Sequence, residues 1–294
     1  MRSALTSACS NFRAAFWGVM FRSTEFLEAL RGPARAMIDA RQIAVVTAHP
    51  DDEIIGCGAQ LPWLSGITIV TVTDGAPRDL VEARARGFTS AQDYANARRV
   101  ELRNALSIAD IPDHNSIGLD LPDQEVALKL VASTRALSEI FATRQTRLVL
   151  THAIEGGHPD HDAVALAVRA TVALYARGGH KISIVEMPYY RAGVRGIVHQ
   201  TFAPAVGRQI RIRLQPWEQE RKREMFAAHA SQASVLACFS IVEEKFRAAA
   251  PFDFRTLPNR DQLLYDQYSS RLTGERWLAL AVAALREFDL APVL

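Results

Sequence analysis

Two short segments of this chain concentrate imidazole and carboxylate groups at spacings that suit metal chemistry. The first is residues 49–53, His-Pro-Asp-Asp-Glu, and the second is residues 155–162, Glu-Gly-Gly-His-Pro-Asp-His-Asp. His158 and His161 are three residues apart, so a helix starting there projects both to one side. The double glycine before them lets backbone approach closely. A catalytic zinc ion commonly takes three such ligands and leaves one position for water.

A centre of this kind supplies the groups that amide or ester hydrolysis requires. A metal with His and carboxylate ligands lowers the pKa of bound water to about 7. Asp51 and Asp52 are adjacent and point in different directions, so one can bind metal while the other takes the water's proton. A further histidine can stabilise the oxyanion or protonate the leaving amine. The candidates for these roles are His49, Asp51, Asp52, His158, Asp160 and His161.

Both segments follow apolar runs, 43–48 and 147–151, that predict buried strands. Further strands are expected at 67–73, 116–121 and 181–186, and helices at 23–40, 57–64, 91–108, 124–143 and 160–175. This alternation predicts an α/β fold, a Rossmann-like doubly wound, mainly parallel sheet with helices on both faces. Such sheets bind ligands at the carboxyl ends of their strands, where the two segments are expected to converge.

The pattern changes after Pro188. Residues 209–214 alternate polar and apolar side chains, which predicts a half-exposed, antiparallel strand. Helices are expected over 217–230 and 274–288, so the chain ends in a strand/helix extension.

Composition limits the classes of function. A chain of 294 residues with 49% hydrophobic content can bury a substantial core. The net charge is +2 without a long cationic run, so no nucleic-acid partner is expected. Three scattered cysteines, Cys9, Cys57 and Cys238, indicate neither a disulfide framework nor a thiolate zinc site.

No transmembrane segment is expected, because the apolar patch at 14–21 is too short and Arg22 interrupts it. This N-terminal segment is interpreted as a peripheral helix or disordered leader rather than a signal peptide. Together with the cysteine usage, this favours a cytoplasmic location. The sequence does not indicate the oligomeric state.

Together, the two segments resemble the paired signature of the PIG-L/LmbE-type zinc N-deacetylases, which remove acetyl from N-acetylglucosamine-type sugars and their conjugates. Supporting matches lie at 73–75, 98–102, 121–123, 231–232 and 244–247, and the resemblance covers roughly residues 41–290. It implies a single deacetylase domain over 41–294 and a small amino-sugar conjugate as substrate. Residues 1–40, which have no counterpart in the family, are expected to form an N-terminal leader and helix.

The resemblance also implies a role for each motif residue. His49, Asp52 and His161 match zinc ligands, Asp51 the general base, and His158 the group that stabilises the oxyanion and protonates the amine. Asp160 matches a residue that orients a histidine, and Arg98 and Asp123 resemble sugar-contacting positions. Zn²⁺ is the expected metal, with Fe²⁺ as the alternative, because such sites accept several ions.

Several residues outside the motifs have two readings. His152 is close enough to the second motif in sequence that it either supports the site residues or packs in the core. The other histidines, His114, His180, His199 and His229, are expected at the surface or in packing. Residues 189–191, Tyr-Tyr-Arg, should emerge at the carboxyl edge of the sheet, where the rings either stack on a sugar or cap the core, and capping is preferred.

Two other functions stay open. An amidase or esterase acting on another N-acyl metabolite would use the same metal centre, which does not encode the acyl-bearing group. A non-catalytic metal-containing binding protein would not need both Asp51 and His158. A nucleotide-binding oxidoreductase is disfavoured, because residues 56–61 lack the third glycine or alanine of the dinucleotide fingerprint.

Overall fold

The computed structural model describes residues 21–203, 208–268 and 272–294. The apolar N-terminal patch before Phe21 and the cysteine at position 9 lie outside these ranges. Among the described residues, no helix combines the length and the apolar character that crossing a bilayer needs.

A seven-stranded sheet in the order β3-β2-β1-β4-β5-β9-β8 forms the centre of the molecule. The first five strands in chain order pair in parallel: β1 (Ile43–Thr47), β2 (Thr68–Pro77), β3 (Ser116–Asp123), β4 (Leu148–His152) and β5 (Ser183–Met187). Antiparallel strands β9 (Glu243–Ala248) and β8 (Gln209–Arg213) extend it. The predicted Rossmann-like, mainly parallel sheet with a C-terminal extension is confirmed.

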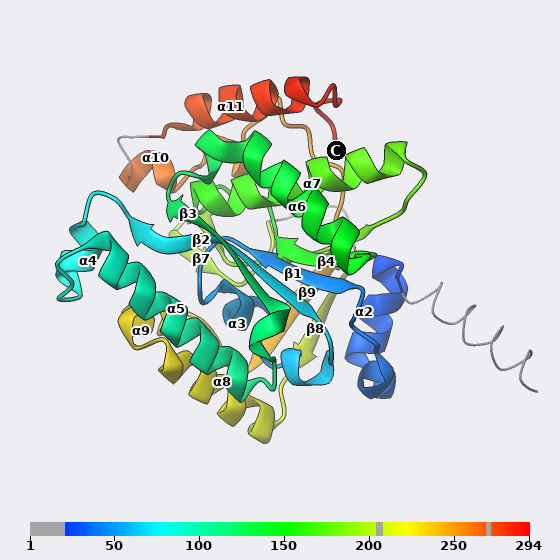
Figure 1. The fold of residues 1–294 in the computed structure, drawn as a ribbon, viewed down its shortest axis with the longest axis vertical. Helices are drawn as coiled ribbons and strands as arrows, with labels where there is room; N and C mark the ends of the chain where they lie inside the picture. Colours follow the sequence, from blue (N-terminus) through cyan, green and yellow to red (C-terminus); the bar gives the residue numbers. More distant parts are fainter. Residues whose placement is uncertain (1–20, 204–207, 269–271) are drawn as a thin grey trace, which may run out of the picture.

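Helices cover both faces of this sheet (Figure 1). One face carries α6 (Leu130–Arg144), α7 (Pro159–Arg177) and α11 (Gly274–Glu287). The other carries α2 (Ser23–Arg31), α3 (Asp52–Cys57), α5 (Ala91–Ile108), α8 (Pro216–Ala228) and α9 (Ala233–Leu236). Side chains alternate along β1, so Val45 packs in one of these layers and Val46 in the other.

Shorter elements complete the part of the chain that the structure describes. They are α4 (Val81–Ala85), α10 (Tyr265–Tyr268), the hairpin β6 (Tyr190–Gly193) and β7 (Gly196–His199), and six 3₁₀ turns: η1 (Pro33–Met37), η2 (Leu61–Trp63), η3 (Asp113–Asn115), η4 (Val126–Lys129), η5 (Ala230–Gln232) and η6 (Pro258–Asp261).

The sheet places the two motifs at its switch point. β1 pairs with β2 on one side and with β4 on the other, so the strand order reverses between β1 and β4. The chain leaves the carboxyl ends of these two strands into residues 49–53 and 155–162. This is where open parallel sheets form a crevice for ligands.

Three predicted helices differ from the observed ones. The helix expected over 23–40 stops at Arg31, because Gly32 and Pro33 interrupt it before η1. The helix expected over 57–64 begins earlier, at Asp52 inside the first motif, and only η2 follows. The helix expected from 124 begins as η4 and becomes α6 at Leu130.

A fully buried ion pair fastens the antiparallel extension to the motif side of the sheet. Lys222 Nζ on α8 lies 2.6 Å from Glu244 Oε1 on β9, and both side chains are fully buried. Lys222 also donates to the Ile55 carbonyl on α3, and Glu244 accepts from the backbone of Ala59 and the side chain of Gln60. The pair therefore joins α8, β9 and the end of α3.

We expect Lys222→Met to destabilise the protein by about 3 kcal/mol or more, because it leaves the Glu244 carboxylate buried without its counter-charge. The free energy of unfolding from urea denaturation measures this change. Adding Glu244→Gln to the same chain should recover part of the loss, since the neutral amide removes the unpaired charge. A cost below about 1 kcal/mol for Lys222→Met would contradict this account.

Candidate metal centre

Donor atoms from the two motifs meet within hydrogen-bond distance of one another. His49 Nδ1 lies 3.2 Å from His161 Nε2 and 3.2 Å from Asp52 Oδ2. Asp52 Oδ1 lies 3.3 Å from the same His161 nitrogen. Ligands about 2.0–2.1 Å from a tetrahedral zinc ion are separated by about 3.3 Å. The three side chains therefore fit the ligand set of such an ion.

Hydrogen bonds orient His49 for this arrangement. Its Nε2 lies 3.1 Å from Asp123 Oδ1 and 3.6 Å from Asp160 Oδ2. A carboxylate on that side favours a proton on Nε2, which leaves the lone pair on Nδ1 toward Asp52 and His161. Asp160 in turn accepts from the backbone nitrogens of Gln124 and Val126 at 2.6 and 3.1 Å.

Two further histidines border the same space, but their hydrogen bonds direct them to other tasks. His152 Nε2, 3.6 Å from Asp52, accepts from the Ala48 backbone N–H at 2.8 Å, so its lone pair is already used. His158 Nδ1 accepts from the Asp160 backbone N–H at 3.2 Å. A neutral His158 therefore carries its proton on Nε2, where it is a donor rather than a ligand.

The electrostatics of the cluster favour a cation at its centre. Burial alone would lower the pKa of His49, yet Asp123, Asp160 and Asp52 raise that pKa well above its ordinary value. Burial would raise the pKa of Asp52, but His161 and His152 hold it well below its usual range. Burial lowers the pKa of His158 well below its usual range, with a further contribution from His49, so this ring is neutral.

Asp51 occupies a strained position at the start of α3. Its φ is 138°, in a region that side-chain-bearing residues rarely adopt, and such strain concentrates at functional sites. Its side chain is buried and pairs with Arg98, whose Nη2 lies 3.0 Å from Oδ2. Burial raises the pKa of Asp51 to about 7, against the lowering effect of Arg98 and with the raising effect of Asp52.

Arg98 on α5 connects the loop after β1 with the end of β2, next to this carboxylate. It donates to the Gly75 carbonyl at 2.7 Å and to the Pro50 carbonyl at 2.8 Å. Gly75 has a φ of +66°, and a Cβ there would lie 2.3 Å from the guanidinium, so this position near the end of β2 requires glycine. Arg98 and Asp123, expected to contact a sugar, thus contact Asp51 and His49 and also line the cleft.

The double-glycine loop is equally constrained. Gly156 has a φ of +68°, and a Cβ on Gly157 would lie 2.0 Å from the Tyr190 carbonyl oxygen. The Asp162 carboxylate accepts from the backbone nitrogens of Glu155 and Gly156. Through these hydrogen bonds, the first turn of α7 fixes the position of the loop that leads to His158 and His161.

The motif side chains open into a cleft with a cavity volume of about 120 Å³. Its other walls come from residues that the sequence did not single out as site residues, namely Ile55, Glu82, Gln232, Val235 and Phe239, and from Tyr190. Ile55 follows the first motif and Gln232 lies in one of the supporting matches, whereas Glu82, Val235 and Phe239 lie in segments without a motif, so only the fold brings these three to the cleft.

The structure places the tyrosines and histidines for which the sequence left two interpretations. Tyr189 is fully buried and donates to the Asp52 carbonyl, so it caps the core as preferred, whereas Tyr190 faces the cleft. His114 and His180 are exposed, and His229 is fully buried. Cys57 is also fully buried and unpaired, in agreement with a packing role.

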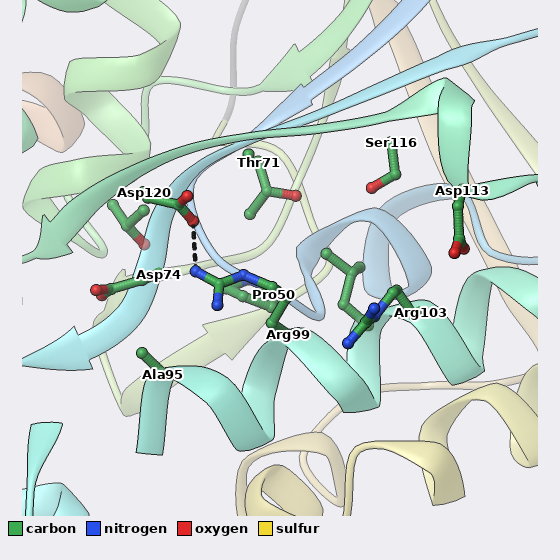
Figure 2. A pocket seen from close by; sticks show the side chains of 12 residues that line it. Pro50, Thr71, Asp74, Ala95, Arg99, Arg103, Asp113, Ser116 and Asp120 are labelled. Atoms are coloured by element: carbon green, nitrogen blue, oxygen red, sulfur yellow. Dashed lines mark hydrogen bonds and ion pairs between the residues drawn. The ribbon is translucent and has the colours of Figure 1, made fainter. Parts of the chain in front are cut away.

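A second cavity, of about 160 Å³, lies between α5 and the β2–β3 edge of the sheet (Figure 2). Arg99 forms an ion pair there with Asp120, 2.9 Å away. Asp120 has a φ of 52° and lies where the β2–β3 register shifts. Among the described residues, no histidine lines this cavity.

Comparisons with known proteins show which proteins this chain resembles. Residues 44–172 match the model of the PIG-L family, described as GlcNAc-PI de-N-acetylase. A 1D-myo-inositol 2-acetamido-2-deoxy-alpha-D-glucopyranoside deacetylase of Catenulispora acidiphila is 29% identical over 47% of this chain and 50% of its own length. The 1D-myo-inositol 2-acetamido-2-deoxy-alpha-D-glucopyranoside deacetylase of Corynebacterium diphtheriae is 31% identical over 43% of this chain and 50% of its own length. The chain spans about half the length of these curated relatives.

Solved structures share the fold. A deacetylase from the biosynthesis pathway of teicoplanin superposes with a TM-score of 0.55 at 16% identity, covering 70% of this chain and 96% of that one. The A40926 pseudoaglycone deacetylase has a TM-score of 0.55 at 20% identity, covering 72% and 100%. At these identities the likeness concerns the fold alone.

We expect His161→Ala to lose tightly bound divalent metal, because it removes one of the three donors of the set His49 Nδ1, Asp52 and His161 Nε2. Metal content after dialysis, measured by inductively coupled plasma mass spectrometry, checks this. His180→Ala, which changes an exposed histidine, is the matched control and should keep one metal per chain. Full occupancy in His161→Ala would refute ligation by His161.

Proposed function

We propose that this chain, whose residues 44–172 carry the PIG-L family domain, is a metal-dependent hydrolase that removes the N-acetyl group from an N-acetylglucosamine-type sugar or glycoconjugate. One observation carries the proposal: the donor set His49, Asp52 and His161 lies in the same cleft as Asp51 and His158. Residues 41–294 form its single catalytic domain. The named activity of the relatives, deacetylation of an acetamido sugar, supports the substrate class.

In this proposal His49 Nδ1, Asp52 and His161 Nε2 hold one divalent metal, with Zn²⁺ first and Fe²⁺ second. The bound ion supplies Lewis-acid activation of water and polarises the amide carbonyl. Asp160 and Asp123 keep the His49 ring oriented, because both carboxylates face its Nε2. His152 supports the His161 ring from behind, since the two rings stack with centroids 4.0 Å apart.

Asp51 is the general base. Its carboxylate is buried, next to the donor set, and its pKa of about 7 suits proton transfer near neutral pH. It takes one proton from the attacking water. His158 is neutral and carries its remaining proton on Nε2, so it donates a hydrogen bond to the carbonyl oxygen as negative charge develops. The proton on Asp51 is then available to the departing amine, with His158 as the second donor in the cleft.

Experiments can distinguish the other candidate functions from this one. An amidase or esterase on another N-acyl metabolite would use the same five residues with a different substrate. A binding protein without turnover does not need a base at a strained backbone position, and Asp51 occupies such a position.

We expect the metal-loaded protein to release acetate from N-acetylglucosamine conjugates. Asp51→Asn should lower kcat at least about a hundredfold while metal content stays, because the amide cannot accept the proton. Asp113→Asn, which makes the same change at an exposed aspartate, is the control and should match wild type. Metal loss in Asp51→Asn would overturn the assignment as base. Wild type without acetate release across the panel would move the substrate outside acetamido sugars.

The pH dependence tests the Asp51–Arg98 pair. The carboxylate form is the active base, so activity falls as the pH drops through the pKa of Asp51. Arg98 lowers that pKa. Arg98→Met should therefore move the acid limb of kcat/KM to higher pH by about one unit or more. Arg98→Lys keeps the charge and should shift the limb less. Acid limbs that coincide in wild type and both variants would show that this pair does not set the profile.

A further inference from the structure

Glu53 completes the first motif, but the proposed function gives its side chain no task. The side chain lies on the first turn of α3 and is fully buried. A buried carboxyl group is costly unless its oxygens find partners. The contacts of the two oxygens therefore indicate what this residue does.

One carboxyl oxygen of Glu53 binds the backbone of the proposed base. Its Oε2 accepts a hydrogen bond from the Asp51 backbone N–H, with 3.2 Å between oxygen and nitrogen. An aspartate at the N-cap of a helix usually accepts from the helix backbone with its own side chain. The Asp51 side chain makes no such bond, and instead it pairs with Arg98 and lines the cleft. Glu53 therefore anchors the Asp51 backbone while the Asp51 carboxylate stays available to the cleft.

His229 lies next to the other carboxyl oxygen. Its Nε2 is 3.9 Å from Glu53 Oε1, and both side chains are fully buried. Among the described residues, neither this oxygen nor either ring nitrogen has a hydrogen-bond partner. His229 directly follows α8, whose Lys222 donates to the Ile55 carbonyl. One segment, 222–229, thus contacts α3 at its first turn and again at Ile55.

The hydrogen bond from Asp51 to Glu53 matters because the Asp51 backbone is strained. A φ of 138° persists only where surrounding contacts hold it, and the free energy of such strain is similar to that of one hydrogen bond to a buried group. A general base must also lie within hydrogen-bond reach of the proton that it takes. Without this bond, we expect the Asp51 backbone to relax and its carboxylate to move away from the donor set.

We propose that Glu53 is a positioning residue for the general base: its carboxyl group holds the Asp51 N–H and keeps Asp51 in the conformation that presents its carboxylate to the cleft. His229 holds Glu53 in turn, beside the oxygen that Asp51 does not use. Neither residue belongs to the described lining of the cleft, so both act through Asp51. The inference rests on the proposed function, to which it adds two buried residues that set the position of the base.

Two variants of Glu53 separate positioning from packing. Glu53→Met keeps the length of the side chain but removes both oxygens, and we expect it to lower kcat by about thirtyfold or more with KM within about threefold. Glu53→Gln keeps an oxygen that can accept from the Asp51 N–H, so its kcat should stay within about fivefold of wild type. Metal content should stay the same in both. Full kcat in Glu53→Met, or an equal loss in both variants, would overturn the proposal.

Glu218 supplies the matched control. It is also buried, and its Oε2 accepts from the N-cap nitrogen of a helix, the Gln215 backbone N–H of α8, at 2.8 Å. Glu218→Met should lower the melting temperature, as the loss of a capping box does, but leave kcat within about twofold of wild type. Equal losses of kcat in Glu218→Met and Glu53→Met would show that general destabilisation causes both, and would contradict the positioning role.

A double-mutant cycle shows whether Glu53 acts through Asp51. In the Asp51→Asn background, adding Glu53→Met should lower kcat by less than about threefold, because no base remains to be positioned. If the two single losses multiply instead, Glu53 has an independent role and the proposal fails.

His229→Leu tests the same contacts from the other end, and it keeps the test available if Glu53→Met does not fold. It should lower kcat by about threefold or more and add less than about twofold to the loss in Glu53→Met. Thermal melting checks its folding, because the side chain is fully buried. Wild-type kcat in folded His229→Leu would refute the part assigned to His229.

Hydrogen exchange gives a readout that does not depend on turnover. The Asp51 amide, followed by NMR, should exchange about tenfold faster or more in Glu53→Met than in wild type, and within about threefold of wild type in Glu53→Gln. If these rates hold but wild type releases no acetate from N-acetylglucosamine conjugates, the deacetylase proposal fails alone. If wild type releases acetate while Glu53→Met changes neither Asp51 exchange nor kcat, the deacetylase stands and the positioning role is refuted.

Discussion

Negative charge gathered around one imidazole is the constraint on which the rest of the site depends. Asp52, Asp123 and Asp160 are all buried and all face His49. Buried carboxylates at such density are stable only with a cation among them, whether a proton on the ring or a metal ion beside it. Each carboxylate also comes from a different part of the chain, so satisfying this one ring fixes the relative positions of the β1, β3 and β4 ends.

The supporting structure follows from that requirement. β3 reaches Asp123 only after a register shift against β2, and the Arg99–Asp120 ion pair lies at the irregular stretch. Arg98, the preceding residue on the same helix, turns inward and donates to the Pro50 carbonyl after β1 and to the Gly75 carbonyl within β2. Helix α5 thus supports the site through Arg98 and the strand edge through Arg99. Because the Arg98 guanidinium lies against Gly75, there is no room for a side chain at that position.

The predictable part of this molecule is the part with local signals. Apolar runs located the parallel strands, and because residues 49–53 and 155–162 each follow one of them, both motifs could be predicted to lie at the carboxyl edge of the sheet. Strand β9 could not be predicted from the sequence, because its buried residues Glu244 and Phe246 alternate with partly exposed charged residues. The burial of the charged Glu244 depends on its ion pair with Lys222. The roles of His152 and His158 also needed coordinates, because backbone N–H groups from Ala48 and Asp160 decide which nitrogen is free. Tyr190 follows a predicted strand and is expected at the carboxyl edge of the sheet, but the place of Phe239 in the cleft could not be predicted, since it belongs to a segment without periodicity or motif.

The Lys222–Glu244 pair has a consequence for how the protein is made. All proposed metal ligands have been synthesised once the ribosome has passed His161. Lys222, which donates to the Ile55 carbonyl on α3, and Glu244, which pairs with Lys222, are synthesised much later. A nascent chain that already holds both motifs therefore still lacks the clamp on the helix that begins with Asp52. Translation must run through β9 before the first motif acquires its full support, so a chain cut short after α7 would carry the whole signature and an unsupported α3.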